Sequence, residues 1–82
     1  MQESDIYARL APIFHEVFED ESIVLTPALT AADVPGWNSF QHVNLVVSIE
    51  EAFGIRFQAA EVESMHNLAA MAHQIQTKVA AS

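Results

Sequence analysis

The sequence has no cysteine, and only three of its 82 residues are lysine or arginine. Without cysteine, neither a disulfide framework nor a thiolate nucleophile is available. The three basic residues, Arg9, Arg56 and Lys78, stand against eleven Asp and Glu, which gives a formal net charge of −8. Nucleic-acid-binding proteins gain affinity by neutralising phosphates with basic side chains, so we expect no nucleic-acid partner. The same charge favours partner proteins with basic patches and disfavours anionic membranes.

Long apolar runs are also absent. No stretch approaches the length of a membrane span, and the N-terminus lacks the basic region and apolar run of an export signal. We therefore expect a cytoplasmic protein that has no membrane partner. The composition, 51% hydrophobic and 17% charged, is typical of a folded chain. A chain of this length predicts one domain over residues 1–82, which buries about 60–65% of its unfolded surface and leaves no room for a two-lobed active-site cleft.

Apolar residues recur at helical spacing in several segments, and no segment has the pattern of a strand. The predicted helices span residues 4–18, 39–53, 59–63 and 67–79, and residues 80–82 are predicted to be a frayed tail. Ser4 is the expected N-cap of the first helix. Pro12 interrupts the apolar stripe of that helix without shifting its phase, which favours one kinked helix. A helix that starts at Pro12 is the alternative.

Residues 22–36 show no sustained periodicity and are predicted to form a long loop. One-turn helix starts are expected at Thr26-Pro27 and over residues 30–33, where the second has a capping-box pattern. Four residues are too apolar for a free linker and are expected to fold back on the core: Ile23, Val24, Leu25 and Leu29. The predicted fold is therefore all-α, a small bundle of three principal helices plus one short helix, with a long first loop. Because such a loop can cross the end of a bundle, an up-down arrangement is not required.

The helix predicted over residues 39–53 is unusually apolar. Its apolar arc comprises Val43, Leu45, Val46, Val47, Ile49 and Phe53. Its polar stripe is narrow and comprises Gln41, Asn44, Ser48 and Glu51. An arc this broad predicts a helix that is contacted on several sides. Gly54 fits a left-handed C-cap, with Ile55 folding back on the last turn.

Ser39 lies at the expected start of that helix, where a serine ordinarily acts as the N-cap. Its surroundings are more specific: Trp37-Asn38-Ser39-Phe40, then the apolar helix, then Glu50-Glu51-Ala52-Phe53-Gly54-Ile55. In order and spacing, this stretch resembles the attachment region of acyl carrier proteins. In that family a serine in an Asp-Ser-Leu context bears phosphopantetheine and begins the second helix. The flanking helices match loosely, so the resemblance covers nearly the whole chain.

The resemblance implies a discrete acyl carrier protein that is not itself an enzyme. A separate phosphopantetheinyl transferase would attach 4′-phosphopantetheine covalently to Ser39 from a coenzyme A donor. The terminal thiol of that arm would hold acyl cargo as a thioester, for enzymes that load or transfer acyl groups and have complementary docking surfaces. We expect the carrier to be a monomer.

A tryptophan at position 37 favours a specialised carrier of a lipid or secondary-metabolite pathway over the housekeeping fatty-acid carrier. The identity and length of the cargo are not predicted. One alternative is an aminoacyl or peptidyl carrier of the same fold, although such carriers more often have glycines before the serine. The other alternative is a small acidic interaction module that is never modified.

The motif departs from the family pattern at two positions. Family members usually have aspartate where Asn38 stands and leucine where Phe40 stands. The aspartate is thought to help the transferase dock, so Asn38 predicts slower loading, while an asparagine still caps a helix. Acidic residues on the second and third helices of the family meet basic patches of partner enzymes. Partner recognition is accordingly expected at Trp37, Asn38, Phe40, Asn44, Glu50 and Glu51.

Other chemistries find less support in the sequence. His42 follows Ser39 by three residues, but a nucleophilic triad needs a third member that cannot be identified. Glu50 and Glu51 are adjacent and point in different directions on a helix, so no acid–base pair is indicated. The other histidines lack the spacing of zinc ligands and are expected to be solvated: His15, His66 and His73. Trp37 is expected to shield the helix start, and its indole could also line the path of the arm.

Overall fold

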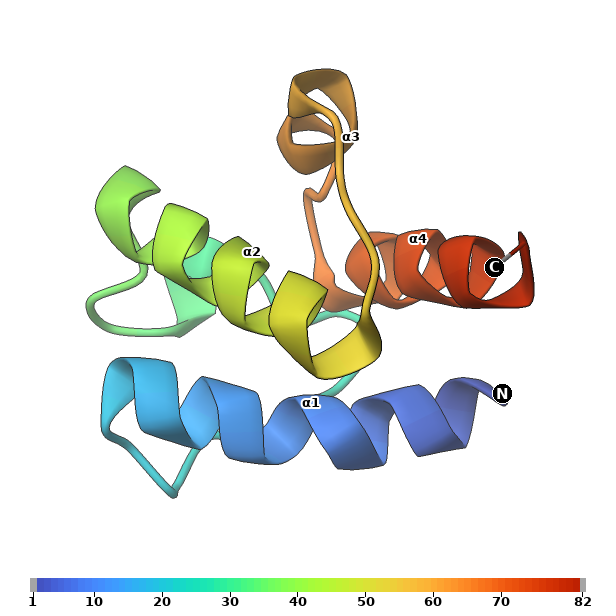
Figure 1. Cartoon of the computed structure of the whole chain (residues 1–82). Coiled ribbons are helices and arrows are strands. Elements are labelled where there is room, and N and C mark those ends of the chain that lie inside the picture. Colours follow the sequence, from blue (N-terminus) through green and yellow to red (C-terminus); the bar gives the residue numbers. More distant parts are fainter. Residues whose placement is uncertain (1, 82) are drawn as a thin grey trace.

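The computed structural model describes residues 2–81, and within that range every regular element is a helix (Figure 1). In chain order these are α1 (Glu3–Phe18), the single-turn 3₁₀ helix η1 (Ala31–Asp33), α2 (Ser39–Phe53), α3 (Ala59–Glu63) and α4 (Leu68–Ala81). The predicted all-α fold, with three principal helices, one short helix and a long first loop, is confirmed. None of the described helices is both long enough and apolar enough to cross a bilayer.

Helix α1 begins one residue earlier than predicted. The N-cap is Gln2, and the Oδ2 atom of Asp5 accepts a hydrogen bond of 3.1 Å from the Gln2 backbone amide. The prediction of Ser4 as N-cap was therefore wrong, because the carboxylate of Asp5 reaches back to cap the helix from its third position. Pro12 lies inside the continuous helix, so a helix that starts at Pro12 is also wrong. Pro12 and Ala8 are both exposed, so water can reach the Ala8 carbonyl that lost its donor.

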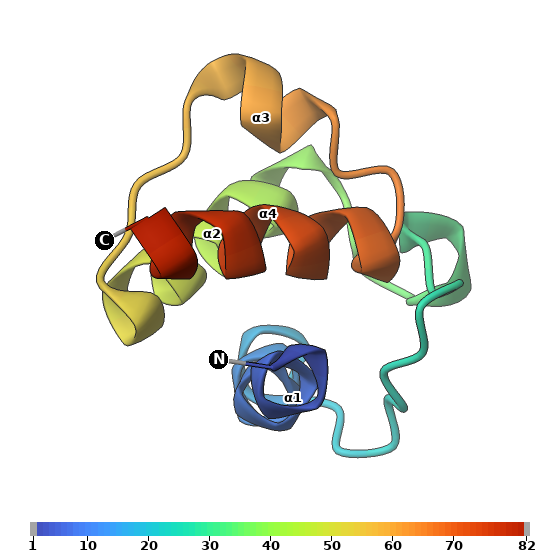
Figure 2. The same cartoon turned by 90° about the vertical axis from the view of Figure 1, so that its right-hand side faces the viewer.

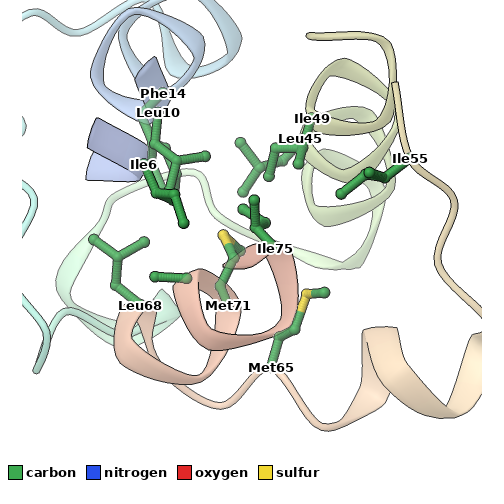
Figure 3. Close-up of a cluster of buried hydrophobic side chains, with 11 residues drawn as sticks. Ile6, Leu10, Phe14, Leu45, Ile49, Ile55, Met65, Leu68, Met71 and Ile75 are labelled. Carbon is green, nitrogen blue, oxygen red and sulfur yellow. The ribbon is translucent and has the colours of Figure 1, made fainter. Parts of the chain in front are cut away.

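The core forms where α1, α2 and α4 meet (Figure 3). Helix α1 contributes residues at four-residue spacing, namely Ile6, Leu10 and Phe14, all completely buried. The other completely buried side chains of α2 and α4 include Leu45, Ile49, Leu68 and Ile75. Seen along its axis, α1 lies on one side of α2 and α4, with α3 on the opposite side (Figure 2). Helix α3 thus lies beyond the layer of α2 and α4, on the side away from α1 (Figure 2).

The long first loop does more than connect α1 to α2. The carbonyl oxygens of Leu29 and Pro27 accept hydrogen bonds from the amides of Leu68 and Ala69, at 2.9 and 3.0 Å. These are among the first amides of α4, which have no partner within their own helix. Asn67 adds a side-chain cap through its Oδ1 atom, 2.9 Å from the Ala70 amide. The loop therefore closes the N-terminus of a helix far away in sequence.

The loop predictions are partly confirmed. Leu25 and Leu29 pack against the core as expected, but residue Val24 is 73% exposed, so the prediction for Val24 was wrong. The capping box at Thr30 is present, with Asp33 Oδ2 3.0 Å from the Thr30 amide. Thr26-Pro27 forms a turn, closed by the 3.1 Å bond from the Leu29 amide to the Thr26 carbonyl, and not a helix start.

The connection from α2 to α3 turns at Gly54. Gly54 has a φ of 67°, the left-handed C-cap that was predicted, and Ile55 is buried behind it. Glu50 then fixes the following segment, because its Oε2 atom accepts a 2.8 Å hydrogen bond from the Phe57 amide. Lys78 of α4 holds α3 through a 2.9 Å ion pair with Glu61.

Helix α4 runs two residues beyond its predicted end. The prediction of a frayed tail was therefore wrong for residues 80 and 81, while Ser82 lies outside the described residues. The buried residues of α4 recur at helical spacing on one side of the helix: Leu68, Met71, Ala72 and Ile75.

Candidate functional site

The start of α2 is capped by Asn38 and not by Ser39. Asn38 has extended backbone angles, and its Oδ1 atom accepts a 2.9 Å hydrogen bond from the Gln41 amide. This is the geometry of an N-cap, which leaves Ser39 as the first helical residue. The expectation that Ser39 caps the helix was therefore wrong, because the asparagine before it already satisfies the free amide.

The hydroxyl of Ser39 is consequently available. Ser39 is exposed, and none of the hydrogen bonds found in the described part of the chain involves its side chain. The turn before it depends on Gly36, whose φ of 86° is strained for any residue with a Cβ atom. This turn brings the chain into α2 with the serine on the surface.

Trp37 anchors this end of α2 to α1. Its ring lies 5.5 Å from that of Phe14, edge to face, and 5.7 Å from that of Phe18. On the other side, the indole stacks on His42 with the ring centroids 6.0 Å apart. The indole Nε1–H donates a 3.1 Å hydrogen bond to His42 Nδ1. A single side chain thus joins the core, the turn and the first turn of α2.

A cavity of about 650 Å³ opens beside Ser39, between the start of α2 and α3. Its lining residues are Ala31, Trp37, Asn38, Ser39, His42, Val43, Val62, Glu63, Met65 and His66. The structure therefore brings together three of the predicted site residues, Trp37, Asn38 and Ser39. The contribution of α3 was missed from the sequence, because the short helix was predicted but its position over α2 is a long-range property.

Helix α2 carries a second apolar face that is exposed. Phe40, Val43 and Val47 follow one another at three- and four-residue spacing, with 74%, 59% and 45% of each residue exposed. The opposite face of the helix is buried through Leu45 and Ile49. The prediction that α2 is contacted on several sides was therefore wrong for Val43 and Val47, because the broad arc is divided between the core and the surface.

The remaining predicted recognition residues lie apart from the cavity. Asn44 is exposed and donates a 2.9 Å hydrogen bond to Gln41 Oε1. Glu51 is exposed, whereas only 13% of the Glu50 side chain is. The Glu50 carboxylate binds the Phe57 amide and lies 3.6 Å from Arg56. The Glu50 carboxylate is thus already paired within the molecule.

The histidines do not form a metal site. Within the described residues, no group of three histidine, cysteine, aspartate or glutamate side chains could hold an ion. His66 and His73 are exposed, as expected. The expectation for His15 was wrong, because it is half-buried with its Nε2 atom 3.1 Å from the Ile23 carbonyl oxygen. It ties the first loop to α1.

The comparisons with known proteins give one informative result. No protein-family model matches the chain, and no curated protein matches it either. Among solved structures, the chain is similar to the solution NMR structure of the holo acyl carrier protein from Geobacter metallireducens. The two share 39% sequence identity and a TM-score of 0.87, over 92% of this chain and 86% of that one. The similarity thus extends over nearly the whole chain.

Proposed function

This chain belongs to the acyl carrier protein family, and from that premise we propose that Ser39 is the residue that carries 4′-phosphopantetheine. The observation that carries the proposal is the state of its side chain. Because Asn38 caps α2, the Ser39 hydroxyl has no hydrogen-bond partner in the described residues and is exposed at the first helical position. The similar solved structure is of a holo acyl carrier protein, which supports the same prosthetic group here.

The surroundings of Ser39 fit such a group. An arm attached to the Ser39 hydroxyl would enter solvent beside the cavity, which offers apolar surface from Val62 and Met65 and polar groups from His42 and His66. Phosphopantetheine supplies a terminal thiol that binds acyl groups as thioesters, a group this cysteine-free chain cannot provide. The exposed apolar face of α2 serves partner recognition, while acyl carrier proteins are not themselves enzymes.

Loading is the transfer of a phosphopantetheinyl group to serine. The Ser39 oxygen attacks the phosphorus atom that bears the pantetheine in coenzyme A, and a phosphodiester bond forms. The phosphoanhydride bond breaks, 3′,5′-ADP leaves, and the serine proton passes to a base of the transferase or to water. The transferase supplies the catalysis. Ser39 supplies an oxygen that no hydrogen bond within the described part of the chain occupies.

The docking face is proposed to be the exposed side of α2. The first turn of α2 has no acidic residue. Between Ser39 and Val47, the exposed residues besides Ser39 are Phe40, Val43, Asn44 and Val47. A surface that is apolar and neutral here, on a chain of net charge −8, favours partners that contact it through apolar side chains. We therefore place the protein in a specialised pathway, as a monomeric carrier domain over residues 1–82.

Modification of Ser39 can be measured as a mass change. Incubation with coenzyme A and a broad-specificity phosphopantetheinyl transferase should add one phosphopantetheine, and Ser39→Ala should abolish the addition. Ser64→Ala is the matched control, because the Ser64 hydroxyl is already bound 2.8 Å from the Glu61 carbonyl oxygen. An unchanged mass with several transferases would favour the unmodified interaction module. Finding an aminoacyl cargo on the natural protein would favour the aminoacyl carrier.

A further inference from the structure

The bond between Trp37 and His42 determines the state of the imidazole. The indole Nε1–H can only donate a hydrogen bond, so the His42 Nδ1 atom, 3.1 Å away, must accept it. An accepting Nδ1 carries no hydrogen, so the ring is the neutral tautomer with its hydrogen on Nε2. Trp37 is itself held by Phe14 and Phe18, which fixes the position of the donor.

The Nε2–H group of His42 has no partner among residues 2–80, although the residue is half-buried. His42 lies three positions after Ser39, on the same side of the helix, and both residues line the same cavity. The other titratable groups of this cavity are Glu63 of α3 and His66 of the following linker. The cavity therefore contains a fixed donor, close to Ser39, that the protein itself does not use.

We propose that His42, oriented by Trp37, donates its Nε2–H to a phosphate oxygen of the phosphodiester that joins the arm to Ser39. This inference rests on the proposed function. A phosphodiester at Ser39 places a negative charge at the first helical position, where the amides of α2 also favour an anion. A hydrogen bond to a charged acceptor is shorter and stronger than one between neutral groups. His42 is thus a positioning residue for the arm, and Trp37 holds its tautomer.

The test compares the apo and loaded forms of the protein by NMR of the imidazole nitrogens, with loading verified by mass. Both forms are measured at the same pH. In the apo protein, the nitrogen shifts of His42 should identify the Nε2–H tautomer. After loading, the Nε2 signal should shift, its hydrogen should exchange more slowly with water, and both changes should be absent for His73.

Three variants separate positioning from simple proximity. His42→Phe should move the phosphorus resonance of the loaded protein toward that of a free phosphodiester, while His73→Gln, on the exposed side of α4 and outside the cavity, should leave it unchanged. Trp37→Phe keeps an aromatic ring against Phe14 but removes the N–H donor. His42 should then become a mixture of tautomers, and the slow exchange of its Nε2 hydrogen in the loaded protein should be lost.

The outcomes distinguish this inference from the proposed function. If loading on Ser39 succeeds but the His42 nitrogen signals equal those of the apo protein, the inference is overturned and the attachment site stands. An equal response of the apo protein to inorganic phosphate at the same concentration would show a general anion site and overturn the role in positioning the arm. If no mass is added, the proposed function fails, and the inference fails with it. The comparison of apo with loaded wild-type protein needs no variant to fold.

Discussion

Two neighbouring side chains divide the tasks at the start of α2. Asn38 caps the helix through the Gln41 amide, and Ser39 follows it with a hydroxyl that has no hydrogen-bond partner in the described part of the chain. Both residues belong to the stretch that resembles the attachment region of acyl carrier proteins. Which of the two is the N-cap could not be predicted from the sequence, because serine and asparagine are both favourable N-cap residues. Only the backbone geometry shows which of the two is outside the helix.

Alanine substitutions at Ser39 and Asn38 should therefore change the stability of the fold by different amounts. Ser39→Ala should change the free energy of unfolding by less than about 0.5 kcal/mol, the usual effect of an exposed substitution. Asn38→Ala should cost about 0.5–2 kcal/mol, because the Gln41 amide loses its acceptor. Denaturant titration measures both. A larger loss for Ser39→Ala than for Asn38→Ala would show that the cap has been assigned to the wrong residue.

Asn38 should also slow loading. The family usually has an aspartate at this position, and the amide removes one charge-assisted contact with the transferase, worth about 1.5–3 kcal/mol at most. Asn38→Asp keeps the N-cap and should raise the initial rate of phosphopantetheine transfer by a housekeeping transferase. Asn44→Asp, away from the cavity, is the control for added negative charge. An equal rise in the loading rate from both variants would mean that the transferase does not specifically recognise the residue at position 38.

At the scale of the element, α2 has two apolar faces, one buried and one exposed. Leu45 and Ile49 fill the core, while Phe40, Val43 and Val47 are exposed. The helical periodicity correctly predicted where this helix begins and ends. The periodicity could not show which apolar residues of α2 are buried and which are exposed, because a valine that faces solvent and one that faces the core give the same pattern. The division depends on α1 and α4, which lie far away in the sequence.

Removing the exposed face should affect partners more than folding. Val43→Ala should lower the rate of acyl transfer by a natural partner enzyme while changing the free energy of unfolding by less than about 0.5 kcal/mol. Leu45→Ala, on the other face, should cost about 2–5 kcal/mol through the cavity it leaves. Enzyme assays and denaturant titration provide the two readouts. Unchanged transfer by Val43→Ala and by a Val47→Ala variant would contradict the docking role of this face.

The same exposed face predicts that the enzymes of fatty-acid synthesis use this carrier poorly. Asn44 stands early on α2, where carriers of that pathway usually place acidic groups that meet basic partners. Asn44→Glu should therefore raise turnover by fatty-acid enzymes, most clearly at low salt, where electrostatic steering is least screened. Complementation of a fatty-acid carrier deletion provides an independent readout. Efficient complementation by the natural sequence would contradict the specialised role and leave the carrier assignment intact.

Helix α3 should be the element most sensitive to acid. The pKa of Glu61 is lowered from its ordinary value of 4.5, first by the hydrogen bond from the Gln58 amide and then by the bond from Lys78. A lowered pKa in the folded state means that Glu61 stabilises the fold above pH 4.5, and that this contribution is lost as the pH falls below that value.

Backbone hydrogen exchange can follow this loss. At about pH 4 the α3 amides should exchange faster, relative to those of α4, than they do at neutral pH, after correction for intrinsic rates. Glu61→Gln should show the faster α3 exchange already at neutral pH. Glu63→Gln is the matched control on the same helix. Equal protection of α3 at both pH values would contradict this role of Glu61.

At the scale of the whole molecule, the site depends on contacts between distant segments. The first loop caps α4 through Leu29 and Pro27, and Lys78 of α4 holds α3 through Glu61. Helix α3 then forms one wall of the cavity beside Ser39. The helices and the long loop could be predicted from the sequence, while attachment at Ser39 stays a prediction. The cavity and the Trp37–His42 bond could not be predicted, because both depend on where the chain folds back.

The measurement that tests the central claim most directly is the location of the adduct in protein coexpressed with a broad-specificity transferase. Trypsin cleaves after Arg9 and Arg56, so Ser39 falls in the peptide of residues 10–56 together with Ser22 and Ser48. Fragmentation of this peptide should place one phosphopantetheine on Ser39. Ser22 binds Asp20 and Ser48 is half-buried, so neither should carry it. An adduct on either of them, or none on the peptide, would contradict the account.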